Sequence, residues 1–260
     1  MIATQLLMRT LGRRSTDDAQ QLLDTRLLDC SMLSSKERYE LQDAMLPAKL
    51  IPAYTDLVRE GDEVDSLFIV MSGWACRYAI TSAGARQMPA IMVPGDVGNL
   101  DSLMFAQLDY GVRSLTPVTV VALPRQRAHA LMSEHPGISQ AFTWLALLEN
   151  AILSQRTVSL GRRSSTERLA HILCELSARL GVERDNESRF AFPLTQETIA
   201  DLLGITGVHV NRTIQHLRAD GLVVDADRVM WLPDVARLRA LGGFDPGYLH
   251  LGGPQITQIM

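Results

Sequence analysis

The stretch from Thr195 to Val223, TQETIADLLGITGVHVNRTIQHLRADGLV, constrains the fold of this chain more than any other. Its apolar residues recur every three or four positions on either side of Gly204, which predicts two short helices joined by a tight turn. Thr195 and Thr206 stand where the two helices would begin, and their hydroxyls can cap the free backbone N–H groups there. The stretch therefore predicts a helical hairpin of the helix-turn-helix type.

The outward face of the second predicted helix carries no acidic residue. From Thr206 to Arg218 the chain has two arginines and two histidines but no Asp or Glu. A polar helix face without negative charge suits a polyanion. Because a helix in the DNA major groove reads base edges with its N-terminal half, we expect Val208, His209 and Arg212 to contact bases. Arg212 can donate two hydrogen bonds to one guanine.

Helix starts supply further candidates, because their free N–H groups attract phosphate. We expect phosphate contacts at Thr195, Gln196 and Thr206, a role that is compatible with capping. The full set of predicted DNA contacts is Thr195, Gln196, Thr206, Gly207, Val208, His209, Asn211, Arg212 and Gln215. A capped helical hairpin in an ordinary protein core is the alternative that the pattern alone leaves open.

The run LGITGVHVNRTIQHLRADGLV resembles, without a gap, the helix-turn-helix of the Crp/Fnr superfamily of bacterial transcription regulators. The resemblance implies that the second helix enters the DNA major groove and that Arg212 matches the family's base-reading arginine. Two β-like runs at 222–224 and 229–232 would complete a winged helix-turn-helix. Many relatives carry an acidic residue at the position of Val208 and a larger polar residue at Gly207. Val208 cannot accept a hydrogen bond from cytosine, but it can touch a thymine methyl group.

Short β-type runs separated by turn residues fill the chain from Ile51 to Leu123. Turns recur roughly every 8 to 12 residues, as at Glu60-Gly61-Asp62 and Pro94-Gly95-Asp96, which is typical of an antiparallel sandwich or barrel of about seven or eight strands. These turns also match the cyclic-nucleotide-binding jelly roll of the same superfamily. The resemblance thus extends over roughly residues 50–241.

Helical patterns flank the β region. Ser34 and Ser35 look like the start of a helix in a helical lead-in. A second helical run, from Pro136 to Ser159, has residues near heptad a and d positions that predict the seam of a two-chain dimer, while packing on the chain's own barrel is the alternative. The seam residues are Ala141, Leu145, Leu148, Ile152 and Gln155. Residues 161–165 should break the helix and form a hinge before another helix from Thr166 to Leu180.

A chain of 260 residues, 47% of them hydrophobic, is long enough for two domains. We predict an α+β fold in which an N-terminal antiparallel β jelly roll is followed by a long dimerisation helix and a C-terminal winged helix-turn-helix. The segments are a cyclic-nucleotide-binding-like sensor with its helical lead-in (1–135), the dimerisation helix (136–160), the DNA-binding domain (161–241) and a C-terminal tail (242–260). The net charge of −4 implies that DNA affinity is local rather than general.

The predicted effector pocket is where the sensor departs most from the family. Relatives that bind cyclic nucleotides present a Gly-Glu-Leu to the ribose after the PGD turn and an Arg-Ser pair to the cyclic phosphate further on. The corresponding residues here are Gly98, Asn99, Leu100 and Asp101, followed by Leu108 and Asp109. A carboxylate at Asp109 would repel a phosphate, so the sequence disfavours a cyclic nucleotide as the effector. Arg113 falls beyond the phosphate position.

Other cofactors and catalysis find little support. The three cysteines, Cys30, Cys76 and Cys174, are too scattered for an iron–sulfur cluster, which needs about four thiolates, and they form no zinc motif. All six histidines lie at position 129 or later, which disfavours haem in the barrel and leaves Cys76 as its one candidate ligand there. P-loop, GxSxG and HExxH motifs are absent from the sequence, which indicates a non-enzyme.

We therefore expect a homodimeric transcription regulator that binds a palindromic operator in double-stranded DNA, with RNA polymerase as a further partner. No apolar run reaches the roughly 18 residues of a membrane span and no secretory leader is evident, so we expect a cytoplasmic location. The alternative is a protein-interaction module of the same architecture that acts mainly through a partner. A DNA reader should lose affinity steeply between about 50 and 200 mM salt, which separates the two.

Overall fold

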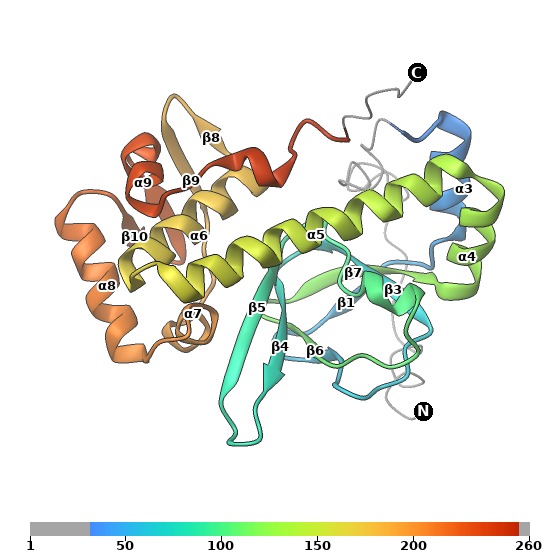
Figure 1. Ribbon diagram of the computed structural model, residues 1–260, viewed down its shortest axis with the longest axis horizontal. Helices are drawn as coiled ribbons and strands as arrows, with labels where there is room; N and C mark the ends of the chain where they lie inside the picture. The colour runs from blue at the N-terminus through green and yellow to red at the C-terminus, as the bar shows by residue number, and fades with distance from the viewer. Residues whose placement is uncertain (1–31, 255–260) are drawn as a thin grey trace.

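The computed structural model describes residues 32–254 (Figure 1). The predicted lead-in before Met32, Cys30 and the last six residues of the tail lie outside this range. Within it, a β domain (residues 35–134) and a C-terminal domain (residues 165–242) are joined by a single long helix (Figure 1). This arrangement confirms the predicted α+β fold. No helix among the described residues combines the length and the apolar character that crossing a membrane requires.

Antiparallel strands build the β domain. Among the described residues, β1 to β7 form two sheets, in the order β1-β7-β3 and β2-β6-β4-β5. Short helical segments flank these sheets. The elements are α3 (Ser35–Ala44), β1 (Lys49–Ile51), β2 (Asp56–Val58), β3 (Ser66–Ser72), β4 (Ala75–Ile80), β5 (Arg86–Met92), η1 (Leu100–Leu103), β6 (Gly111–Ser114), β7 (Val118–Pro124) and α4 (Arg125–Glu134). The predicted jelly roll and its number of strands are therefore confirmed.

The start of α3 lies where the sequence predicts it. Ser34 and Glu37 form a capping box, in which the Ser34 hydroxyl accepts from the Glu37 backbone N–H and the Glu37 carboxylate accepts from the Ser34 N–H. The other oxygen of Glu37 accepts from the backbone N–H of Gly137 at 3.0 Å. This contact ties α3 to the first turn of the long helix.

The long helix α5 (Pro136–Arg162) extends two residues beyond the predicted end at residue 160. Gly161 remains helical, because one glycine in a helix costs only about 1 kcal/mol and the surrounding helix tolerates it. The break comes at Arg163, whose backbone is extended, and Ser164 then caps α6 (Ser165–Leu180) with a capping box to Glu167. The helix therefore starts at Ser165, one residue before the predicted Thr166.

The assignment of the α5 stripe to a dimer seam is wrong. Its four apolar residues are at most 9% exposed and pack inside this chain. Ala141 and Leu145 join Leu67 in the core of the β domain, while Leu148 and Ile152 join a second cluster that also contains residues of the C-terminal domain. Gln155, the fifth seam residue, is half-buried. A heptad pattern records that one helix face is buried, but it does not say against which chain.

The C-terminal domain packs four helices against a small sheet, in strand order β10-β11-β9-β8, within the described residues. Its core includes the buried stripes of α7 and α8. Gly242 is required at the end of α9, since a Cβ atom there would lie 2.6 Å from the backbone nitrogen of His171 on α6. The elements after α6 are β8 (Glu183–Arg184), β9 (Glu187–Ala191), α7 (Gln196–Leu203), α8 (Gly207–Ala219), β10 (Val224–Ala226), β11 (Val229–Leu232), α9 (Val235–Gly242) and η2 (Pro246–Leu249).

The two domains touch directly as well as through α5. Arg86 at the start of β5 donates from Nε to Asp201 at 2.6 Å and from Nη2 to Glu197 at 2.9 Å, and both acceptors lie on α7. Beside this ion pair, Met88 and Ile91 of β5 belong to the same hydrophobic cluster as the core of the C-terminal domain. The apolar core is thus continuous across the contact.

Candidate nucleic-acid interface

Helices α7 and α8 form the predicted helix-turn-helix. The Thr195 hydroxyl accepts from the Thr198 backbone N–H at 3.1 Å, and the Thr206 hydroxyl accepts from the His209 N–H at 3.4 Å. Between them, Gly204 ends α7 with a φ of +66°, a conformation that suits glycine. Arg168 on α6 supports the turn from behind by donating to the Leu203 carbonyl at 2.8 Å. The caps hold the two helices in the predicted register.

The predicted base-contacting residues share the solvent face of α8. Val210, Ile214 and Leu217 are buried in the domain core. The opposite face is exposed and carries Val208, His209, Asn211, Arg212 and Gln215. Val208 is 68% exposed, which is a large exposure for an apolar side chain. Of the remaining predicted contacts, Thr195, Gln196 and Thr206 are exposed at the two helix starts, and Gly207 is half-buried.

The two arginines of α8 differ in whether a neighbouring carboxylate pairs with them in the described part of the chain. Arg218 forms an ion pair with Asp225 of the wing, and His216 contacts Asp220 at 3.1 Å. Both partners lie just beyond the acid-free window from Thr206 to Arg218. By contrast, Arg212 is exposed and makes no ion pair with any residue in the range 32–254. Arg212 is therefore the arginine of this helix whose donors remain available to a ligand.

His209 is engaged by a residue that sequence analysis did not single out. Its Nε2 atom lies 2.9 Å from the hydroxyl of Ser165, the first residue of α6. The contact joins the first turns of α6 and α8, although 44 residues separate the two side chains in the chain. His209 remains exposed, so it can still meet DNA, but its ring is held toward α6. No local pattern could have indicated this partner.

The tip of the wing adds a cation that the sequence analysis also missed. Asp227 and Arg228 connect β10 to β11 and adopt φ values of +51° and +61°. Both residues are exposed. The position of Arg228 at the tip follows from the strand pairing Ala226↔Val229. Arg228 is thus an exposed cation at the tip of the wing.

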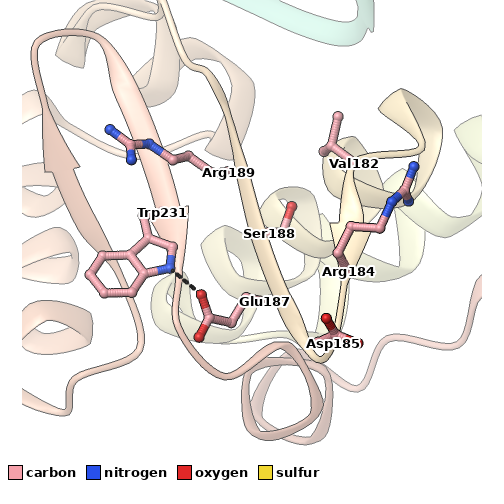
Figure 2. A pocket seen from close by; sticks show the side chains of 7 residues that line it. All are labelled: Val182, Arg184, Asp185, Glu187, Ser188, Arg189 and Trp231. Carbon is pink, nitrogen blue, oxygen red and sulfur yellow. Dashed lines mark hydrogen bonds between the residues drawn. The ribbon is translucent and has the colours of Figure 1, made fainter.

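The outer face of the wing sheet forms an open groove of about 570 Å³ (Figure 2). Trp231 on β11 is 38% exposed, and its Nε1 donates to Glu187 at 3.2 Å. Arg189 on β9 pairs directly across from Trp231 in the sheet, so the indole and the guanidinium lie side by side (Figure 2). The lining residues are Val182, Arg184, Asp185, Glu187, Ser188, Arg189 and Trp231. Sequence analysis did not identify this groove.

The residues predicted for an effector pocket differ widely in burial. Asn99 is fully buried, where it accepts from the Phe68 N–H at 2.8 Å and donates to the Ser66 carbonyl at 2.9 Å, so it serves the fold. Leu100 and Leu108 are core residues, while Asp109 is exposed. These positions were expected to line one cavity. Buried hydrogen bonds and apolar packing occupy most of them, and their role in binding an effector stays a prediction.

Arg77 of β4 fills the space beside the remaining two pocket residues. It is 6% exposed, its Nε donates to the Gly98 carbonyl at 2.9 Å, and its guanidinium lies 4.6 Å from the centre of the Tyr110 ring. The Tyr110 hydroxyl in turn donates to Asp101 at 2.5 Å. An arginine within a mostly apolar strand is a sign in the sequence that its charge must have internal partners. The sequence does not say which partners, because they lie far from Arg77 along the chain.

Glu149 connects this cluster to α5, since its carboxylate lies 2.5 Å from Arg77 Nη2. Burial raises the pKa of Glu149 above its ordinary value, although the Arg77 charge opposes that shift. The adjoining cavity between the Pro94-Gly95-Asp96 turn and α5 measures about 60 Å³. Pockets that hold drug-sized ligands span about 300 to 1,000 Å³, so this cavity is too small for a nucleotide as it stands.

Potential metal ligands and thiols are the remaining candidates in the described part of the chain. No group of three or more His, Cys, Asp or Glu side chains between residues 32 and 254 is arranged to hold a metal ion. Cys76 and Cys174 are buried free thiols in different domains. Burial raises the pKa of each to about 12, which keeps both protonated at neutral pH.

Comparison with known proteins agrees with both halves of the fold. Residues 49–135 match the cyclic nucleotide-binding domain, and residues 167–241 match the Crp-like helix-turn-helix domain. Electron transport regulator A of Shewanella oneidensis is 25% identical over 83% of this chain and 89% of its own length. The transcriptional activator protein FnrL of Cereibacter sphaeroides is 28% identical over 73% of this chain and 77% of its own. FnrL is named as a transcriptional activator, which agrees with the predicted class of transcription regulator.

Solved structures share the same architecture. The structure of FixK2 from Bradyrhizobium japonicum superposes with a TM-score of 0.68 at 21% identity, covering 75% of this chain and 96% of that one. In this chain the two matched domains follow one another with α5 between them. The chain therefore belongs to the Crp/Fnr family of DNA-binding transcription regulators.

Proposed function

We propose that the protein regulates transcription as a homodimer that binds a palindromic operator, with α8 of each subunit in the DNA major groove. The exposed face of α8 carries this proposal, because it combines the free Arg212 with an exposed apolar Val208. Arg212 would pair with O6 and N7 of a guanine, and Val208 would contact a thymine methyl group. Thr195, Gln196, Thr206 and Arg228 would hold the phosphates on either side.

The outer face of α5 supports the homodimer. Exposed residues on this face follow heptad spacing of their own, and none of them is charged. They are Thr143, Ala146, Leu147, Asn150, Ser154, Thr157 and Val158. Leu147 is 63% exposed and Val158 is 47% exposed, whereas the charged Glu149 and Arg156 turn toward their own chain. An uncharged helix face of this length, left open to water, suits a second copy packed by two-fold symmetry.

The segments of the chain follow from these roles. The β domain would act as the regulatory part, α5 as the dimerisation helix over residues 136–162, and residues 165–242 as the DNA reader. Two-fold symmetry would set the two α8 helices about 34 Å apart, one turn of DNA. The Arg163-Ser164 break is where the reader could move relative to α5.

We also propose that DNA binding requires no cyclic nucleotide. Arg77, Tyr110 and Glu149 use one another inside the β domain, and an incoming phosphate would have to break a buried ion pair to reach the guanidinium. Asp109 adds a negative charge at the surface. The three cysteines of the chain are fewer than the roughly four thiolates that an iron–sulfur cluster needs, and Cys76 and Cys174 are buried, so neither is available to a haem without exposing the core.

RNA polymerase is the proposed protein partner, with the groove on the outer wing sheet as its contact. Exposed tryptophan and arginine side chains contribute strongly to protein interfaces, and Trp231 and Arg189 lie together there. The groove is built on strands that leave α8 free for DNA. Trp231→Ala should therefore reduce transcription in vitro from a promoter with the operator while leaving operator affinity unchanged.

The test begins with selection of binding sites from random DNA, followed by fluorescence anisotropy on the best site. A palindrome bound by two chains supports the proposal, and an unrepeated site bound by one chain contradicts it. Leu147→Glu places two like charges at the proposed two-fold axis, so it should give monomers by analytical ultracentrifugation and weaken binding to the full palindrome. Affinity that barely changes between about 50 and 200 mM salt would favour an interaction module over a DNA reader.

A further inference from the structure

The chain continues past the matched helix-turn-helix domain into a segment that lies against α5 and α6 (Figure 1). Phe244 is 7% exposed and Leu249 is 2% exposed, and both belong to the core of the C-terminal domain. The 3-10 turn η2 lies against both helices. This segment, residues 243–249, is called the C-terminal brace below.

Tyr248 of the brace reaches the most buried charged group of the domain. Its hydroxyl donates to one oxygen of Glu175 on α6 at 2.9 Å, and Glu175 is 1% exposed. The same hydroxyl lies 3.1 Å from Nε2 of His171, and the two rings stack with centres 6.0 Å apart. Phe244 meets the His171 ring edge to face at 5.3 Å. The brace is therefore seated by specific polar and aromatic contacts.

Glu175 links the brace to α5 and to the β domain. Its second oxygen accepts from Arg156 of α5 at 3.3 Å and from Arg179 of α6 at 3.2 Å. Arg179 also pairs with Asp96, in the turn after β5. Burial would raise the pKa of Glu175, but the two arginines and the Tyr248 hydroxyl hold it below its ordinary value. One carboxylate thus joins the brace, both helices and the β domain.

A second tether lies at the break between the helices. Arg163, the residue between α5 and α6, donates to the carbonyl of Gly243 at 3.2 Å. The brace therefore contacts the junction at Arg163 and again about three helical turns along α6, at Glu175. Two separated contacts resist rotation of α6 about the break, whereas one would act as a pivot.

The orientation of α6 carries α8 with it. Ser165 at the start of α6 contacts His209 of α8, and Arg168 of α6 holds the turn before α8. In a dimer that binds through α5, the angle between α5 and α6 would thus set the separation of the two α8 helices. We propose that Tyr248 is a positioning residue for DNA recognition, because the C-terminal brace fixes that angle and so selects the spacing of the operator half-sites. This inference rests on the proposed palindrome-binding homodimer.

The experiment compares operator spacing preferences. Wild type, Tyr248→Phe and a chain ending at Gly243 are titrated by anisotropy against palindromes whose half-sites are one or two base pairs closer or further apart than the selected site. Tyr39→Phe, which removes the hydroxyl of an exposed tyrosine on α3, is the matched control. Melting temperature and the salt dependence of binding are measured for each variant, and Tyr248→Phe remains informative if the shortened chain does not fold.

Wild type and Tyr39→Phe should prefer the selected spacing over a one-base-pair change by about tenfold. Tyr248→Phe should reduce this preference to about threefold or less, with the base preference at the Arg212 contact and the salt dependence unchanged. Affinity lost equally at all spacings, or a preference identical to wild type, would overturn the positioning role while leaving the homodimer intact. Wild type that binds one half-site as well as a palindrome would overturn the homodimer itself and, with it, this inference.

Discussion

Two arginines show how differently the two domains use the same side chain. Arg77 in the β domain is 6% exposed and is engaged by the Gly98 carbonyl, the Tyr110 ring and Glu149. Arg212 on α8 is exposed and forms no ion pair with any described residue. A guanidinium with internal partners stabilises its own domain, while one with free donors can recognise a base. The guanidinium of Arg212 is thus available to a ligand, whereas that of Arg77 is part of the internal packing of the β domain.

Removing Arg77 should have the largest effect. Arg77→Met leaves the half-buried Glu149 carboxylate without its partner, which should lower the free energy of unfolding by about 3 kcal/mol. The double variant Arg77→Met/Glu149→Leu should recover most of that loss, because neither charge then remains. Urea unfolding measures both. A loss below about 1 kcal/mol in the single variant would show that water, not Arg77, satisfies Glu149.

A pH titration examines the buried imidazole of the C-terminal domain. Burial, reinforced by the Arg163 and Arg156 charges and opposed by Glu175 and the Gly242 carbonyl, lowers the pKa of His171 to about 4 from 6.5. Below pH 6.5 the unfolded chain binds a proton that the folded protein does not bind until about pH 4. Stability should therefore fall by about 3 kcal/mol as pH decreases through this window. His171→Gln should flatten this part of the curve of unfolding free energy against pH, and an unchanged slope would contradict the assignment.

Truncating Arg212 tests whether the exposed arginine of α8 recognises a base. Arg212→Ala should reduce discrimination between guanine and other bases at one operator position by about 1 to 3 kcal/mol. Because no internal partner is lost, thermal stability should stay at the wild-type value. Arg127→Ala, which removes an exposed arginine on α4 at the opposite end of α5, is the control for net charge (Figure 1). Equal weakening of binding to all sequences would mean that Arg212 holds a phosphate instead.

Cutting the direct link between the domains should have the smallest effect. Arg86→Ala removes the ion pairs to Asp201 and Glu197 and should cost about 1 kcal/mol at low salt, and less at 1 M salt, because these side chains are partly exposed. The control is Arg59→Ala, whose exposed pair with Asp56 lies within the β domain. Midpoints of urea unfolding at two salt concentrations measure both. Equal losses for the two variants would show that the link between domains has no special weight.

Local signals made the helix-turn-helix predictable. The caps at Thr195 and Thr206, the turn at Gly204 and the apolar stripes all lie within one short stretch, so spacing alone determines how they combine. The same holds for the capping box at Ser34. The β domain was predictable for a related reason, since its turns recur at a spacing that few other folds produce.

Contacts between residues far apart in the sequence could not be predicted. The partners of Arg77 come from the residue before β6, from α5 and from the loop before η1, and the Ser165 contact of His209 crosses 44 residues. The apolar stripe of α5 was assigned to a dimer seam for a different reason. Apolar periodicity marks the face that is buried in the chain itself. The exposed face, which includes Thr143 and Asn150, is mostly small and polar and gives no such signal. Asp225, which pairs with Arg218, lies outside the acid-free stretch from Thr206 to Arg218.

The length of α5 makes the molecule sensitive to small angles. A helix of 27 residues is about 40 Å long. If α5 behaves as a rigid rod, a tilt of about 5° about one end displaces its other end by about 3.5 Å. This displacement is close to the 3.4 Å rise between successive base pairs of DNA. A change too small to repack the barrel would thus move α8 by a whole base step. Because the base-pair spacing of DNA is fixed, a tilt of this size would change how well the two α8 helices match their half-sites.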